Sequence, residues 1–129
     1  MKRSVLSGWV LLLSSCGPSV EDHEALWAEK GPTSYHYTYE TSGFIAPLEL
    51  LVMVRSRAVS STTVIAPPEH PGGAPGFTME QLFDDIRQRL GGPCKTTVRY
   101  DQDLGYPRSV YSDCGMEGGG WTVTNLAED

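Results

Sequence analysis

The segment from Thr78 to Leu90 constrains the fold most, because it is an amphipathic helix set between stretches that alternate like strands. Thr78 and Gln81 have the spacing of a capping box, and Phe77 is placed to pack on Leu82. One stripe of the helix is apolar and consists of Met79, Leu82, Phe83, Ile86 and Leu90. The charged residues are expected on the solvent side, namely Asp84, Asp85, Arg87 and Arg89.

Period-two alternation predicts the strands. Tyr35, Tyr37 and Tyr39 alternate with polar residues, which is typical of a strand with one buried face. Three tyrosines on one face could stack on a ligand, but cross-strand packing is the interpretation we favour. A longer β stretch, residues 48–65, folds into a hairpin if it turns near Ser56 and Arg57. Further strands are expected over residues 95–101 and 108–114, and a last one over 121–126, after three glycines.

A first helix precedes the strands. Ser19 is a suitable N-cap, acidic residues follow in the first turn, and Gly31 with Pro32 ends the helix. The predicted order is therefore α-β-β-β-α-β-β-β. Short connections imply antiparallel pairing, so we expect a single α+β domain from about residue 19, with a sheet of five to six strands and two helices on one face.

The first fifteen residues differ from the rest of the chain. Lys2 and Arg3 precede a short apolar run, which is the order of a secretory signal. The run is shorter than the roughly 20 residues that cross a bilayer. A buried N-terminal helix is the alternative.

The end of this run indicates lipidation. Leu13-Ser14-Ser15-Cys16 resembles the lipobox of bacterial lipoproteins, in which a peptidase cuts before the cysteine. The resemblance implies a signal peptide over residues 1–15, a lipid on Cys16 and a mature chain over 16–129. Cys16 is followed by Gly17 and not by aspartate, a pattern that resembles that of lipoproteins sorted to the outer membrane. This resemblance implies a domain that faces the periplasm. The alternative is ordinary signal cleavage, with Cys16 left as a thiol.

Charge limits the partners. The chain carries a net charge of −6, and removal of Lys2 and Arg3 leaves eight basic against sixteen acidic residues, hence −8. An acidic domain repels phosphate backbones, so we expect no nucleic acid partner. Contact with the membrane is expected through the lipid on Cys16, since an acidic surface is also repelled by anionic lipid.

Two cysteines, Cys94 and Cys114, remain for a disulfide. If the turn between the strands is centred near Leu104, Val98 opposes Val110, Thr96 opposes Ser112, and Cys94 opposes Cys114. Opposed residues lie close enough for a disulfide, and export favours its formation. Two free buried thiols are the alternative.

We find no catalytic set, cofactor motif or complete metal site. The three histidines, His23, His36 and His70, lie in no recognisable motif, and solvated surface positions are expected for each. Asp101 and Asp103 could begin a calcium loop, but the later positions lack the ligands of an EF-hand. Turn chemistry explains this segment better.

Through several of these residues, the sequence resembles a family of small bacterial lipoproteins catalogued as domain of unknown function 6174. The matching residues are Trp27, Tyr35, Tyr37, Tyr39, Leu82, Phe83, Tyr100, Asp101, Gly105, Tyr106 and Pro107. Family members often carry a Cys-x-Cys pair where this chain has Gly43 and Ile45. The resemblance implies a fold and a location, and no activity.

The predicted function is therefore a membrane-anchored envelope lipoprotein that is not an enzyme, and that binds or stabilises an unknown envelope protein or peptide. One alternative is an enzyme-inhibitor or peptide-binding module that uses the open sheet face or an exposed edge. An envelope hydrolase built around His36 is the other. A deep pocket that unites His36 with an acid would favour the hydrolase, and a flat sheet face would oppose it.

Overall fold

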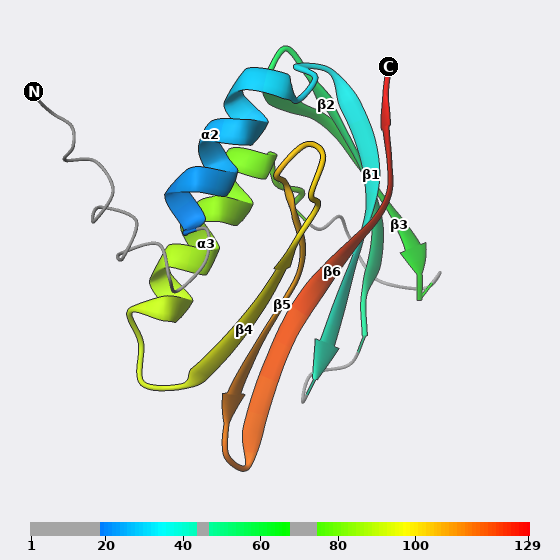
Figure 1. Cartoon of the computed structure of the whole chain (residues 1–129). Helices are drawn as coiled ribbons and strands as arrows, with labels where there is room; N and C mark the ends of the chain where they lie inside the picture. The colour runs from blue at the N-terminus through cyan, green and yellow to red at the C-terminus, as the bar shows by residue number, and fades with distance from the viewer. Residues whose placement is uncertain (1–18, 44–46, 68–74) are drawn as a thin grey trace, which may run out of the picture.

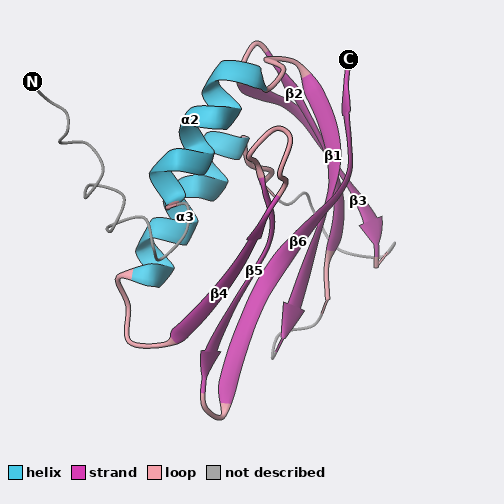
Figure 2. Ribbon diagram, in the orientation of Figure 1, coloured by secondary structure: helices cyan, strands magenta, loops and turns pink. Residues whose placement is uncertain are grey.

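Two helices cover one face of a six-stranded antiparallel sheet (Figure 1, Figure 2). The computed structural model describes residues 19–43, 47–67 and 75–129. The predicted signal, residues 1–15, and Cys16 lie outside them. The elements are α2 (Val20–Lys30), β1 (Tyr35–Gly43), β2 (Glu49–Arg55), β3 (Ala58–Ala66), α3 (Met79–Leu90), β4 (Lys95–Tyr100), β5 (Pro107–Cys114) and β6 (Glu117–Glu128). The predicted α+β class and element order are confirmed.

The strands lie in the order β3-β2-β1-β6-β5-β4. Strands β1 and β6 are therefore central, and β3 and β4 form the edges. The turn between β2 and β3 falls at Ser56 and Arg57, as predicted, and both residues have positive φ, 49° and 67°. Two such residues match the twist of the flanking strands in a tight hairpin.

The core lies between α3 and the inner face of the sheet. The tyrosines of β1 and the apolar stripe of α3 are buried, and Val52, Val110 and Val123 join them. Cross-strand packing, not ligand stacking, thus occupies the tyrosine rings. Leu90 differs from its prediction, since it is 49% exposed. It is the last residue of α3 and lines an open hollow beside the start of α2, so no described residue covers it.

Polar groups of β1 also satisfy the start of α3. The Met79 N–H donates to the Tyr35 hydroxyl at 2.9 Å, and the Tyr37 hydroxyl donates to the Phe77 carbonyl. Thr78 and Gln81 form the predicted capping box. The first of these contacts satisfies an N–H group that a helix start leaves without a partner, and the second ties the residue before the N-cap to β1. Burial raises the pKa of both tyrosines far above the ordinary value.

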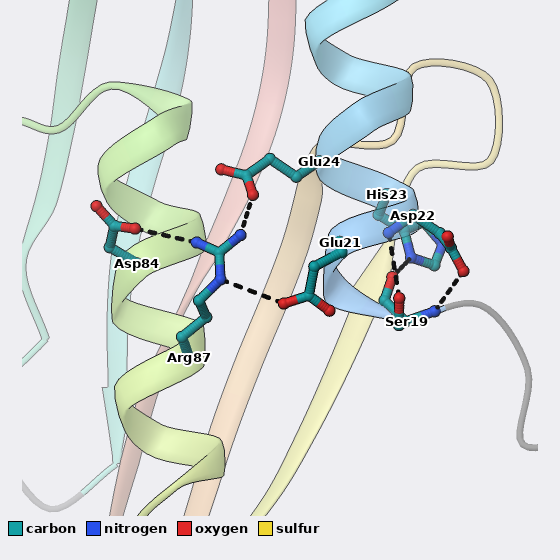
Figure 3. A network of polar contacts seen from close by, with 7 residues as sticks. All are labelled: Ser19, Glu21, Asp22, His23, Glu24, Asp84 and Arg87. Atoms are coloured by element: carbon teal, nitrogen blue, oxygen red, sulfur yellow. Dashed lines mark hydrogen bonds and ion pairs between the residues drawn. The ribbon is translucent and has the colours of Figure 1, made fainter.

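An ion-pair network holds α2 on α3 (Figure 3). Arg87 contacts Glu21, Glu24 and, at 3.0 Å, Asp84. The expectation that Arg87 lies on the solvent side is therefore only partly right, because its guanidinium bridges two helices. The hydrogen bond that Arg87 donates to the Glu24 carboxylate raises the pKa of Arg87.

The turn between β4 and β5 packs against α2. The Asp101 carboxylate accepts the backbone N–H groups of Asp103 and Leu104. Gly105 has a φ of 87°, and a Cβ there would lie 2.9 Å from the Leu26 Cβ, so this position favours glycine. Asp101 and Asp103 thus belong to a turn, which was the interpretation favoured over a calcium loop.

The register of β4 and β5 agrees with the prediction, because Thr96 opposes Ser112 and Val98 opposes Val110. A disulfide joins Cys94 to Cys114, with 4.6 Å between their Cα atoms. The last strand differs, since β6 begins at Glu117 and contains the glycine run that we expected before it. Pairing on both sides, with β1 and β5, holds these glycines in the sheet.

Candidate functional site: a glycine-floored groove

A groove of about 560 Å³ opens on the helix-covered side of the sheet. In Figure 1 the lower ends of β5 and β6 extend past the end of α3, which leaves this part of the inner face uncovered. We call it the glycine-floored groove, and it is lined by Tyr39, Thr41, Ser42, Arg89, Ser112, Cys114, Glu117, Gly118, Gly119, Gly120 and Trp121.

The floor has almost no side chains. Gly119 faces the groove, and a Cβ built there would meet only one atom within 4 Å, the Ser42 carbonyl oxygen at 3.2 Å. Glycine weakens a strand interior, and it often marks a place where a ligand or another backbone approaches closely. Gly119 therefore leaves room in the groove that any larger residue would fill.

A polar network forms one wall of the groove. The Arg89 Nε donates to the Asp85 carboxylate at 2.7 Å, and the Trp121 Nε1 donates to the same oxygen at 2.8 Å. The Arg89 Nη1 donates to the Ser112 hydroxyl at 3.0 Å and to the Gly119 carbonyl at 3.1 Å. Arg89 thus joins α3 to β5 and β6, and its Nη2 has no partner among the described residues.

Tyr39 forms the inner end of the groove. Its ring packs between Phe77 and Trp121, and the side chain is only 8% exposed. Its hydroxyl has no hydrogen-bond partner within residues 19–43, 47–67 and 75–129. Burial, reinforced by the charge of Asp85 and opposed by Arg89, raises the pKa of Tyr39 to about 12. A buried polar group without a partner costs about 1–3 kcal/mol, so a group that enters the groove could satisfy it.

Sequence reasoning missed this site. It placed Asp85 and Arg89 on the solvent side of α3, whereas both are half-buried against the sheet. Their spacing could have indicated this position. Asp85 follows the buried Leu82 by three positions, and Arg89 follows the buried Ile86 by three, so both lie at the border of the apolar stripe. Asp84 is exposed, as predicted.

The histidines that we considered lie elsewhere. His23 stacks on Tyr100 with 3.8 Å between ring centres. His36 lies on the opposite, open face of the sheet, and its Nδ1 is 2.6 Å from an Asp129 carboxylate oxygen. His70 is outside the described residues. Among the described residues, no group of three or more His, Cys, Asp or Glu side chains is arranged to hold a metal ion.

A known family model matches most of the chain. Residues 19–126 match the model of a family described as "Family of unknown function (DUF6174)". The chain belongs to this family. It matches no curated protein and no solved structure.

The residues that carried the resemblance to family DUF6174 are structural in this member. Trp27 is buried and meets Tyr35 and Tyr106 edge-on, while Asp101 and Gly105 shape the turn on α2. They set the fold, and most of the groove lies apart from them. In the part of this DUF6174 chain that the structure describes, no helix is long and apolar enough to span a membrane.

Proposed function

We propose that the protein is an exported lipoprotein of the outer membrane, held by acyl chains on Cys16 and facing the periplasm, whose domain binds another envelope component without catalysis. The observation that carries the binding role is the glycine-floored groove, in which the hydroxyl of Tyr39, a residue that is 8% exposed, lacks a partner among the described residues. The lipobox resemblance of residues 13–16 supports the location.

The chemistry of the groove suits binding. Arg89 forms hydrogen bonds with Asp85 and with Ser112 of the sheet. Among the described residues, neither Arg89 nor Asp85 belongs to a set of nucleophile, base and orienting group. The Tyr39 hydroxyl and the Arg89 Nη2 are donors, so the ligand presents acceptor oxygens. Since the paired charges of Asp85 and Arg89 cancel, we expect an uncharged polar group, such as a peptide carbonyl or a sugar hydroxyl.

Site-specific photo-crosslinking tests the proposal in the native envelope. A photoreactive residue at Glu117, on the groove rim, should form an adduct with one envelope component. The substitution Gly119→Leu fills the groove and should abolish that adduct, while Thr97→Leu on the open face should not. Circular dichroism confirms that each variant is folded. An adduct that survives Gly119→Leu would contradict binding in the groove, and chemical alteration of the bound component would contradict a non-catalytic role.

A second candidate is peptide binding on the open sheet face. A shallow hollow of about 770 Å³ lies there between Arg99 and Arg108, over Ser109, Thr122 and Thr124. Asp101 and Asp103 also line the hollow, but neither arginine forms an ion pair within the described ranges, so each arginine could bind one acidic side chain of a peptide. The same experiment separates the two, because a photoreactive residue at Thr124 would then form the adduct, and Gly119→Leu would leave it unchanged.

A further inference from the structure

The two edges of the sheet differ in charge. Strand β4 carries Lys95 and Arg99 in six residues, and both are exposed. Strand β3, Ala58–Ala66, contains no charged residue in nine, and no described strand pairs with its outer side. Charged side chains are a common means of keeping an edge from pairing with another strand. One edge is therefore protected by charge, and the other is not.

Strand β3 also reads almost the same in both directions. Ala58 and Ala66 end it, Val59 and Ile65 come next, and Thr62 lies in the middle. Two bulges, at Ser60 and Ile65, interrupt its pairing with β2 and leave Ser61–Val64 as a regular stretch. A bulge can itself discourage pairing, so this stretch is the part of the edge that remains suitable for it.

A two-fold symmetric pair of antiparallel strands follows a strict rule. If residue i of one copy opposes residue j of the other, then j also opposes i. Opposed side chains lie on the same face, so residues i and j are separated by an even number of positions. With Thr62 on the axis, Thr62 opposes its own copy and Ser61 opposes Thr63. Cross-strand pairs of serine and threonine are favourable, and no like charges meet.

We propose that two copies of this protein pair through antiparallel β3 strands, with Thr62 on the two-fold axis, to form one continuous sheet. The axis is perpendicular to the sheet, so the helix layers of both copies lie on the same side. Both α2 helices then begin on that side (Figure 2). Two lipid tethers could therefore enter one membrane, a point that rests on the proposed function, whereas the pairing itself does not.

Cysteine substitution tests the pairing in the full-length mature protein. Thr62→Cys should yield a dimer linked from residue 62 to residue 62 on mild oxidation, identified by mass spectrometry of the digest. Ala58→Cys, on the same strand, is the matched control and should not link to itself, because Ala58 opposes Ala66. Equal linkage at both positions would overturn the assigned register.

Charge substitution gives a second measurement that does not depend on cysteine. Thr63→Lys places cations close together across the axis, so the dimer mass in light scattering should fall to the monomer mass. Thr97→Lys on β4 should leave the dimer intact. A monomeric native protein, a dimer that persists in Thr63→Lys, or a Thr62→Cys adduct with a different protein in place of its own copy would each overturn self-pairing. A native protein without a lipid on Cys16 would contradict the proposed anchoring. The β3 pairing does not depend on the lipid and would remain.

Discussion

At the scale of single residues, the three tyrosines of β1 show how one strand serves several needs. Tyr35 and Tyr37 place their hydroxyl groups against the start of α3, where backbone groups need partners. Tyr39 has the same alternating position but points to the groove, past the helix start, and its hydroxyl has no described partner. The sequence pattern shows that all three face inward. Only the position of α3 along the strand decides which hydroxyl remains available.

The raised pKa values of these tyrosines predict loss of stability in alkali. Each deprotonates near pH 10 in the unfolded chain and only at higher pH in the folded one, about 12 for Tyr39. Their contribution is therefore complete below pH 10 and is lost as pH rises through the folded pKa, by roughly 1.4 kcal/mol per tyrosine per pH unit. Urea unfolding between about pH 9 and pH 11, roughly one unit on either side of the ordinary tyrosine pKa, measures the loss.

Ultraviolet absorbance of phenolate provides the check. Tyr111→Phe is the matched control, because it removes an exposed tyrosine and should leave the alkaline unfolding unchanged. If Tyr35, Tyr37 and Tyr39 ionised before unfolding, their burial would not be the cause of the alkaline loss.

At the scale of elements, local signals predicted what local chemistry controls. The capping box of α3, the turn at Ser56 and Arg57, and the register of β4 with β5 follow from residues close together in sequence. The glycines of β6 were misjudged because their strand conformation depends on β1 and β5, which flank them. Arg89 was misjudged for the same kind of reason, since its partners Ser112 and Gly119 are distant in sequence.

Removal of the Phe83 ring should show how much α3 packing contributes. Phe83 is fully buried, so Phe83→Ala should lower the free energy of unfolding by roughly 3–5 kcal/mol, through lost burial and the cavity that remains. Leu90→Ala is the matched control on the same helix, and its exposed side chain should cost well under half as much. Denaturant unfolding measures both. A Phe83→Ala loss no larger than that of Leu90→Ala would show that this face does not form the core.

The disulfide makes the hairpin of β4 and β5 covalent. Alkylation without reduction should leave Cys94 and Cys114 unmodified, and the unreduced digest should contain their linked peptides. The double substitution Cys94→Ala and Cys114→Ala should cost roughly 3 kcal/mol on the chain-entropy model, because the bond closes a loop with a sequence separation of 20. Finding both thiols alkylated in the unreduced protein would exclude the bond.

At the scale of the whole molecule, the helix layer and the open sheet face have different roles. The groove and the start of α2 both lie on the helix side, whereas His36 and the hollow between Arg99 and Arg108 lie on the other. Ser19 caps α2 only three positions after Cys16. A tether of three residues reaches roughly 10 Å at full extension, so a lipid on Cys16 would hold the domain near the membrane surface.

Substitution of Cys16 tests this anchoring directly. If the lipobox resemblance is functional, Cys16 receives the lipid and cleavage then occurs before it, so Cys16→Ala should accumulate as an uncleaved precursor without labelled fatty acid. The native protein should incorporate labelled palmitate and partition with membranes, because each buried methylene contributes about 0.8 kcal/mol and more than one chain makes anchoring stable. Ser15→Ala, which retains the cysteine, is the matched control and should be processed normally. Labelled palmitate in Cys16→Ala would show that the lipid is attached elsewhere, and a cleaved, unlabelled native protein would show an ordinary secretory signal in place of a lipobox.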